Sequence, residues 1–142
     1  MSNADRAVEK FKNGLNCSQS ILSTFGPALG LDEKSCIKIA APFGGGIGHV
    51  QEVCGAVSGA VMAIGLRHGE GTEERDKRDR IIGLAQEFIQ AFTARHGSLR
   101  CRQLLNFDIT TREGLLRARE AEAFAVCGDY IRTAAELLEK ML

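Results

Sequence analysis

The chain has 142 residues, of which 44% are hydrophobic and 25% charged, and this is the size and composition of one folded domain. Eighteen basic residues balance eighteen acidic ones, which argues against a general nucleic-acid or membrane-surface binder because such proteins need an excess of Lys and Arg. The longest apolar run, Val53 to Leu66, is shorter than the roughly 20 residues that span a bilayer. We therefore expect a cytoplasmic domain that binds no nucleic acid and inserts into no membrane.

Helical periodicity begins close to the N-terminus, and strand signals are nearly absent from the whole chain. Good N-cap residues, together with Gly and Pro residues that end helices, set the expected boundaries. The first three expected helices cover about Ala4–Lys12, a segment from just after Asn16 to near Gly26-Pro27, and a segment capped by Asp32 that ends before Pro42.

A glycine-rich segment follows, with Gly44, Gly45, Gly46 and Gly48 within five residues. Such a segment cannot be a stable helix interior, so we expect a loop. Three interpretations stay open: tight backbone packing over the next helix, a cradle of backbone N–H groups for an anion or other ligand, or an opening that lets a substrate or partner reach Cys54. The order of the glycines matches neither the Rossmann fingerprint nor the Walker motif, and no Lys follows to meet a phosphate.

A fourth helix is expected from about Gln51 to His68. Small residues recur along it every four positions, at Gly55, Gly59 and Ala63. Because residues four apart lie on the same face of a helix, they form a flat strip that lets another helix approach closely. We place this helix at the centre of the fold.

Four further helices complete the prediction. Thr72 is the expected N-cap of a long helix that ends at Gly97. A short helix starts at Ser98, a capping box over Thr110–Glu113 opens another, and the last helix follows Cys127. No repeat or linker divides the chain, so we expect an all-α, single-domain bundle over residues 1–142, with about six to eight helices around the small-residue-rich one.

Cysteine placement carries the functional signal. Four of the five cysteines fall at or next to expected helix starts, namely Cys17, Cys54, Cys101 and Cys127. The first N–H groups of a helix are unpaired and carry partial positive charge, which stabilises a thiolate and can lower a cysteine pKa to between roughly 3.5 and 7.5. The thiolate is the form that attacks disulfides and binds metals. Cys36 falls in mid-helix, and we expect it to pack in the core.

The three histidines divide into two groups. His68 and His96 each precede a glycine that ends a helix, where an imidazolium suits the helix dipole, so we expect structural roles for both. His49 lies five residues before Cys54 and could lower a thiol pKa or carry a proton.

These motifs together resemble the signature of the C_GCAxxG_C_C family of bacterial and archaeal proteins, which is described as redox-active. The resemblance covers nearly the whole chain. Its first half rests on Asn16-Cys17-Ser18-Gln19, on the glycine segment Phe43–Gly48, and on the CGAxxG core formed by Cys54, Gly55, Ala56 and Gly59. Its second half rests on Cys101 with Leu104-Leu105 and Asp108, and on Cys127 before the last helix. Two positions depart from the family pattern, because this chain has Asn106 where the family often has Gly and His49 where it often has Arg. Asn tolerates the left-handed conformation, so the turn at Asn106 should survive. The resemblance implies a redox or cluster-related role.

Three hypotheses for function follow. In the first, the four cysteines carry out thiol redox chemistry with an unknown redox partner and need no cofactor; Cys54 is the candidate nucleophile, and Cys17 with Cys54 the candidate disulfide pair. In the second, Cys17, Cys54, Cys101 and Cys127 bind an iron–sulfur cluster or Zn²⁺, although no closely spaced cysteine pair is present. In the third, the chain is a structural or interaction protein. The sequence leaves the enzyme activity and a homo-oligomeric state open.

Overall fold

The computed structural model describes all residues, 1–142, and confirms the all-α architecture. Its eight α-helices are α1 Asn3–Lys12, α2 Cys17–Phe25, α3 Glu33–Ala40, α4 Gly55–His68, α5 Arg75–His96, α6 Cys101–Leu105, α7 Arg112–Glu120 and α8 Cys127–Met141. Short 3₁₀ turns cover Pro27–Leu29, Ala41–Phe43 and Ala123–Val126. There is no strand, and the one isolated bridge joins Val53 to Arg100.

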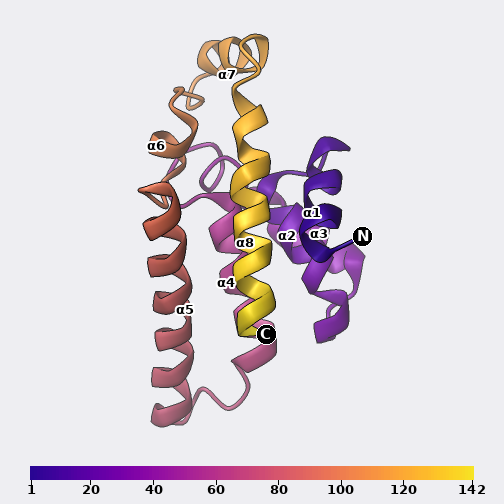
Figure 1. The fold of residues 1–142 in the computed structure, drawn as a ribbon, viewed down its shortest axis with the longest axis vertical. Helices are drawn as coiled ribbons and strands as arrows, with labels where there is room; N and C mark the ends of the chain where they lie inside the picture. The colour runs from indigo at the N-terminus through magenta and orange to yellow at the C-terminus, as the bar shows by residue number, and fades with distance from the viewer.

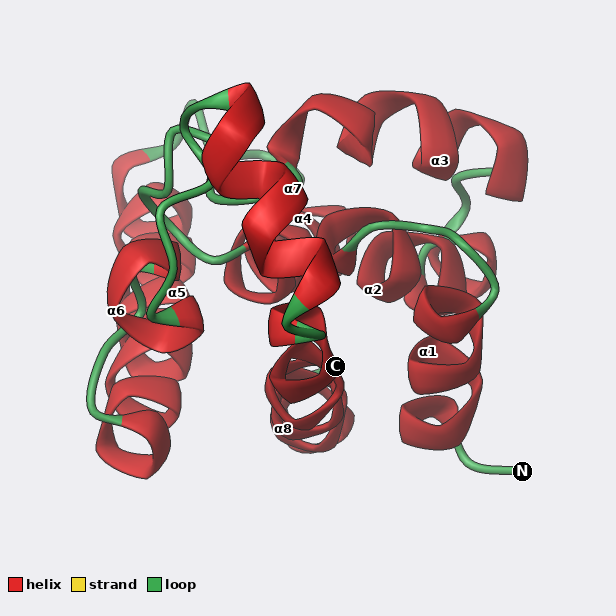
Figure 2. Cartoon of the chain, turned by 90° about the horizontal axis from the view of Figure 1, so that it is seen from above, coloured by secondary structure: helices red, strands yellow, loops and turns green.

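The helices pack in three layers. Figures 1 and 2 show α5, α8 and α1 side by side in one layer, α4 and α2 in the middle layer, and α3 on the far side of α2. The packed pairs agree with this view, since α2 contacts both α4 and α3, and α8 contacts α1, α4 and α5. Helix α7 crosses the end of the bundle where α8 begins (Figure 1).

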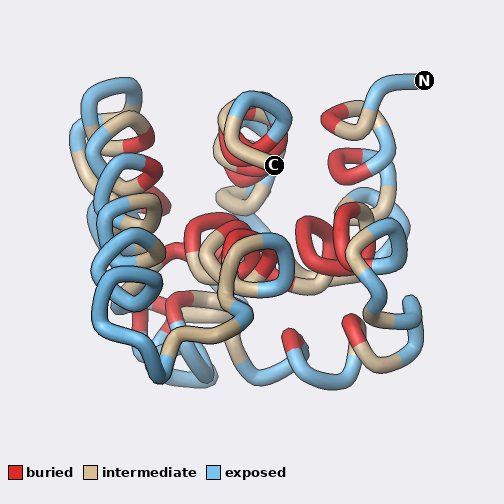
Figure 3. The backbone as a smooth tube through the Cα atoms, turned by 90° about the horizontal axis from the view of Figure 1, so that it is seen from below, coloured by how far each residue is buried: buried red, intermediate tan, exposed pale blue.

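Helix α4 occupies the centre, as its small residues predict. An added Cβ at Gly59 would lie 2.9 Å from the Ser18 carbonyl oxygen, and one at Gly55 would lie 3.0 Å from Cys17 Cβ. The two glycines therefore let α2 lie directly against α4. Figure 3 shows buried positions gathered where the helices face one another, while the outer sides of α5 and α3 are exposed.

Several predicted helix starts are wrong by a few residues. Helix α4 begins at Gly55 and not at Gln51, because Gln51 adopts a left-handed backbone with φ of 64° and the Cys54 N–H donates to the Leu99 carbonyl at 2.8 Å. Hydrogen bonds to a neighbouring segment thus keep residues 51–54 out of the helix. The sequence gives no sign of that neighbour.

Three other helix starts also differ from the prediction. Helix α5 begins at Arg75, with Glu74 and not Thr72 as N-cap. The cap of α7 is Thr111, whose Oγ1 accepts the Gly114 N–H at 3.0 Å, while the Thr110 hydroxyl donates to Asp108 instead. Likewise α6 starts at Cys101 rather than at Ser98.

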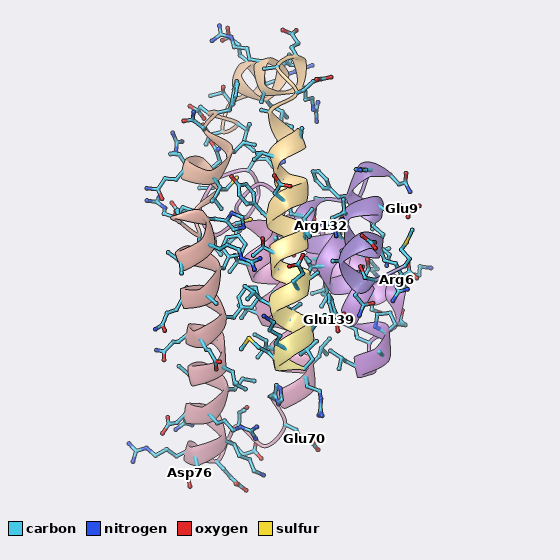
Figure 4. All side chains as sticks on the ribbon, in the orientation of Figure 1. Arg6, Glu9, Glu70, Asp76, Arg132 and Glu139 are labelled. Carbon is cyan, nitrogen blue, oxygen red and sulfur yellow. The ribbon has the colours of Figure 1, made fainter.

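An ion pair and a hydrogen bond on the surface connect α8 to α1. Arg132 of α8 pairs with Asp5 of α1 at 3.0 Å, and Asn3 donates to Glu139 at 2.5 Å. Figure 4 shows Arg132 and Glu139 on the side of α8 that faces Arg6 and the rest of α1. None of the helices combines the length and the apolar character that crossing a membrane requires.

Candidate functional site

The four cysteines expected to act together do meet around one cavity. Its volume is about 30 Å³, and Cys17, Cys54, Cys101 and Cys127 all line it. The remaining walls are two glycines and apolar or aromatic side chains, namely Gly45, Gly55, Leu104, Leu105, Phe124 and Tyr130. The cavity therefore lies where α2, α4, α6 and α8 begin, toward the α7 end of the bundle in Figure 1.

An N-terminal capping box fixes Cys17 as the first residue of α2. Asn16 Oδ1 accepts the Gln19 N–H at 2.9 Å, and Gln19 Oε1 accepts the Asn16 N–H at 3.0 Å. The Asn16 amide also donates to the Ala41 carbonyl at 2.9 Å. The same side chain thus starts the helix and ties it to the segment that leads into the glycine loop.

Backbone pairing between two loops places Cys54 next to Cys101. The Cys54 N–H donates to Leu99 at 2.8 Å, and the Cys101 N–H donates to Glu52 at 2.7 Å. On the outside of this pairing, Arg100 Nη2 lies 3.1 Å from both carboxylate oxygens of Glu52. Cys54 is the N-cap of α4, and Cys101 is the first residue of α6.

Cys127 is the first residue of α8. Tyr130, three residues later, lines the same cavity and donates its hydroxyl to the Leu104 carbonyl at 2.7 Å. The Tyr130 hydroxyl therefore hydrogen-bonds the backbone of α6. All four site cysteines occupy helix starts, as the sequence predicts.

The expectation that helix starts lower all four thiol pKa values is wrong for three of them. Burial raises the pKa of Cys54 to about 12, against the opposing effect of the Ala56 and Val57 N–H groups. The pKa of Cys101 rises to about 11, first through burial and then through the charge of Cys127. Desolvation thus outweighs the helix dipole at these two cysteines.

Cys17 and Cys127 form a hydrogen-bonded pair of thiols. Their shared hydrogen bond raises the pKa of Cys17 well above its ordinary value and lowers the pKa of Cys127. The physical cause is that the Cys17 thiol donates to the Cys127 sulfur and so stabilises the Cys127 thiolate. The first proton of the pair therefore leaves Cys127, and the second is held on Cys17.

Gln51 is a site residue that sequence reasoning missed. Its side chain is fully buried, donates to the Phe107 carbonyl at 2.6 Å and accepts the Ile109 N–H at 2.9 Å. It also hydrogen-bonds Cys101 and lowers the pKa of that thiol, against the larger effect of burial. One amide therefore connects the end of the glycine loop, the segment after α6 and a site cysteine; nothing in the local sequence distinguishes it from a surface glutamine.

The glycine loop is a left-handed turn that satisfies most of its own backbone. Residues 45–49 are consecutive in the left-handed region, with φ between 58° and 73°. The N–H groups of residues 47–52 all donate to carbonyls of residues 42–47, so they are not free to cradle an anion. Of the four glycines predicted to bind a cofactor, Gly45 lines the cavity. Gly44 packs against Asn16, Gly46 packs against Gln51, and an added Cβ at Gly48 would meet nothing within 4 Å.

The other singled-out residues lie away from the cavity. Cys36 is fully buried beside Leu22, which confirms its place in the core. His68 Nε2 lies 2.9 Å from the Met141 carbonyl oxygen, and His96 Nε2 lies 2.8 Å from Thr133 Oγ1, so both side chains hold α8. His49 is exposed and does not line the cavity.

No group of three or more His, Cys, Asp or Glu side chains lies in an arrangement that could hold a metal ion. The four cysteines line a common cavity, but as placed they do not form a set of metal ligands.

Comparison with known proteins gives one match. The sequence model of the family described as "Putative redox-active protein (C_GCAxxG_C_C)" matches residues 15–141. This match includes all four cysteines of the cavity and the glycine loop. No curated protein and no solved structure matches the chain.

Proposed function

The chain belongs to the C_GCAxxG_C_C family, and from this we propose that the cavity is a thiol redox centre in which Cys17 and Cys127 cycle between two thiols and a disulfide. The observation that carries the proposal is that these two side chains, from the starts of two different helices, line one small cavity, where each thiol shifts the pKa of the other. A disulfide requires two cysteines that lie close together, and the shared cavity brings these two together.

Cys127 is the proposed nucleophile. A thiolate, and not a thiol, attacks an oxidised sulfur, and Cys127 is the site cysteine whose pKa is lowered. Cys17 holds its proton until Cys127 has reacted, and it then acts as the resolving residue. Oxidation of the pair forms one S–S bond and passes two electrons to the oxidant, with release of the proton of Cys17.

Cys54 and Cys101 do not belong to the reactive pair in this proposal. The sequence suggested Cys54 as nucleophile, but a pKa of about 12 keeps it a thiol at neutral pH. Cys101 has a pKa of about 11 and is likewise protonated. Both sulfurs line the cavity, so we assign these protonated thiols to the surroundings of the reactive pair and not to the attack on sulfur.

A four-cysteine metal or cluster site was the alternative. The cysteines as placed do not fit it, and we derive no step through a metal. Metal analysis of anaerobically purified protein tests this directly, because one equivalent of bound zinc or iron would revive the alternative.

Disulfide mapping tests the proposed pair. The reduced protein is treated with a mild thiol oxidant, digested without reduction, and analysed by mass spectrometry. A Cys17–Cys127 cross-linked peptide is expected, and Cys127→Ala should abolish it. Cys36→Ala is the matched control, because Cys36 packs in a separate cluster and should leave the cross-link unchanged. A Cys17–Cys54 cross-link in its place would overturn the assignment.

A further inference from the structure

The cavity beside Cys127 has the size and the lining for one additional sulfur atom. Building on the thiol pair of the proposed function, we propose that the oxidant of this pair is sulfane sulfur, the zero-valent sulfur carried at the end of hydropersulfides and polysulfides. Three properties of the cavity support this proposal, namely its volume, its lining and the number of sulfurs that face it.

The volume limits what can reach the sulfurs. At about 30 Å³ the cavity has room for one or two groups of the size of a water molecule. A peptide disulfide or a folded protein loop cannot enter such a space, whereas a single sulfur atom can. The reacting atom must therefore be small, or must be the exposed tip of a longer molecule.

The lining selects an apolar and polarisable atom. Apart from the sulfurs the walls are glycine and carbon, and the Tyr130 hydroxyl is turned to the Leu104 carbonyl. A buried water needs two to four polar partners, and here the side chains that face the cavity offer only sulfurs, which are weak donors and acceptors. Sulfur is soft and polarisable and packs well against aromatic and aliphatic carbon.

The arrangement of the four cysteines favours one covalent bond over a set of metal bonds. No three of these side chains are placed to hold a metal ion together. A transferred sulfur needs one bond, to Cys127, and soft surroundings, which the sulfurs of Cys54 and Cys101 supply. Both of these thiols are protonated at neutral pH, so each can donate a hydrogen bond.

The reaction balances in two steps. The Cys127 thiolate attacks the outer sulfur of a hydropersulfide R–S–SH; the donor S–S bond breaks, Cys127–S–SH forms, and the charge leaves as the thiolate RS⁻. Cys17 then attacks the inner sulfur of Cys127, the bond to the outer sulfur breaks, and the disulfide forms with release of H₂S. The two protein thiols lose two electrons, and the zero-valent sulfur gains them.

The experiment uses the reduced full-length chain and two sulfane probes. Sodium tetrasulfide supplies inorganic polysulfide and glutathione hydropersulfide supplies a thiol-bound source, while hydrogen peroxide and glutathione disulfide are the oxidants without sulfane sulfur. The wild-type protein should release sulfide and form the Cys17–Cys127 disulfide with a sulfane probe. Cys17→Ala lacks the resolving thiol, so its intact mass should rise by one sulfur atom on Cys127 with loss of sulfide release. Cys17→Ser is a second trap if the alanine variant does not fold.

The controls define what would overturn the inference. Cys127→Ala should gain no sulfur, and Cys36→Ala should match the wild type; equal sulfur addition to the Cys127 variant would overturn it. Faster oxidation of the pair by hydrogen peroxide or glutathione disulfide than by both sulfane probes would also overturn the sulfane-sulfur inference. The Cys17–Cys127 pair of the proposed function would not be contradicted by that result. Sulfur held on Cys127 in the wild type, with no Cys17–Cys127 disulfide, would support the capture step and would contradict the pair of the proposed function. Reaction with one sulfane probe alone supports the inference and identifies its source.

Discussion

Cys17 and Cys127 are each the first residue of a helix, yet their pKa values move in opposite directions. The helix start is common to both, so it cannot cause the difference. The cause is the hydrogen bond between them, in which one sulfur gives its proton and the other keeps a charge. At this scale, the contact between two side chains decides which thiol is reactive.

Replacing Cys17 therefore changes the reactivity of Cys127. Cys17→Ala removes the hydrogen-bond donor, so the pKa of Cys127 should rise and its alkylation at neutral pH should slow. Cys17→Ser keeps a hydroxyl donor at the same place and should restore part of the rate. The measurement is the rate of iodoacetamide labelling of Cys127 against pH, followed by mass spectrometry. Identical midpoints for the alanine variant and the wild type would contradict the hydrogen bond.

Glycine lets elements of this fold approach one another closely at particular positions. Helices α2 and α4 are the clearest case, because Ser18 and Ile21 of α2 lie over Gly59 of α4. The same approach sets the distance between Cys17 at the start of α2 and Cys54 at the start of α4. Packing of this helix pair and the geometry of the site are therefore coupled.

A matched pair of glycine substitutions on α4 tests this coupling. The Cβ of Gly59→Ala would lie 2.9 Å from the Ser18 carbonyl oxygen, and such overpacking should cost about 1–3 kcal/mol of unfolding free energy. Gly65→Ala meets nothing within 4 Å and should stabilise the protein by about 0.5–1 kcal/mol, because alanine favours a helix over glycine. Urea denaturation measures both. The idea fails if the two variants shift stability in the same direction.

The glycine loop offers a second comparison at this scale. Gly46 and Gly48 both have positive φ, of 73° and 58°. Gly48→Ala has open space around its Cβ. Its free energy of unfolding should fall only by the cost of the left-handed backbone for a residue with a Cβ, about 1–2 kcal/mol. The Cβ of Gly46→Ala would lie 2.6 Å from Gln51 Cα, so this variant should lose more stability and should also change the labelling rate of Cys101, which Gln51 contacts. Equal losses and an unchanged Cys101 rate would show that the loop does not hold Gln51 in place.

For the molecule as a whole, protonated thiols in the interior link stability to alkaline pH. In the folded state the pKa of Cys54 is about 12, compared with an ordinary value of 9.0. A group whose folded pKa is raised stabilises the fold fully below its unfolded pKa and loses that contribution as the pH rises toward the folded value. The bundle should therefore weaken between about pH 9 and pH 12, and the effect of Cys54 alone should be about 1.4 kcal/mol per pH unit.

Cys54→Ser isolates that contribution, because serine does not titrate in this range while other groups are unchanged. The free energy of unfolding of wild type and variant is measured by urea denaturation at pH values from about 8 to 11. The variant should show a smaller loss of stability with rising pH. Parallel curves would mean that Cys54 ionises in the folded protein without penalty.

The helices and their ends are predictable from local sequence signals to within a few residues. Periodicity located all eight helices, the small residues of α4 predicted its central place, and Asn106 takes the left-handed conformation that an asparagine allows, with φ of 58°. These features are local, since hydrogen bonds and side chains within a few residues of each position decide them. The placement of four cysteines at helix starts followed from the same signals.

Which thiols lie together, and which of them are protonated, depends on how distant parts of the chain pack. Each cause involves groups far apart in the chain. These causes are the burial of Cys54, the interaction of Cys17 with Cys127, and the hydrogen bond from Gln51 to Phe107. The pairing of residues 51–54 with residues 99–102 moved the start of α4 for the same reason. Local propensity cannot report such contacts, because the free energy of a buried thiol depends on what the folded chain packs around it.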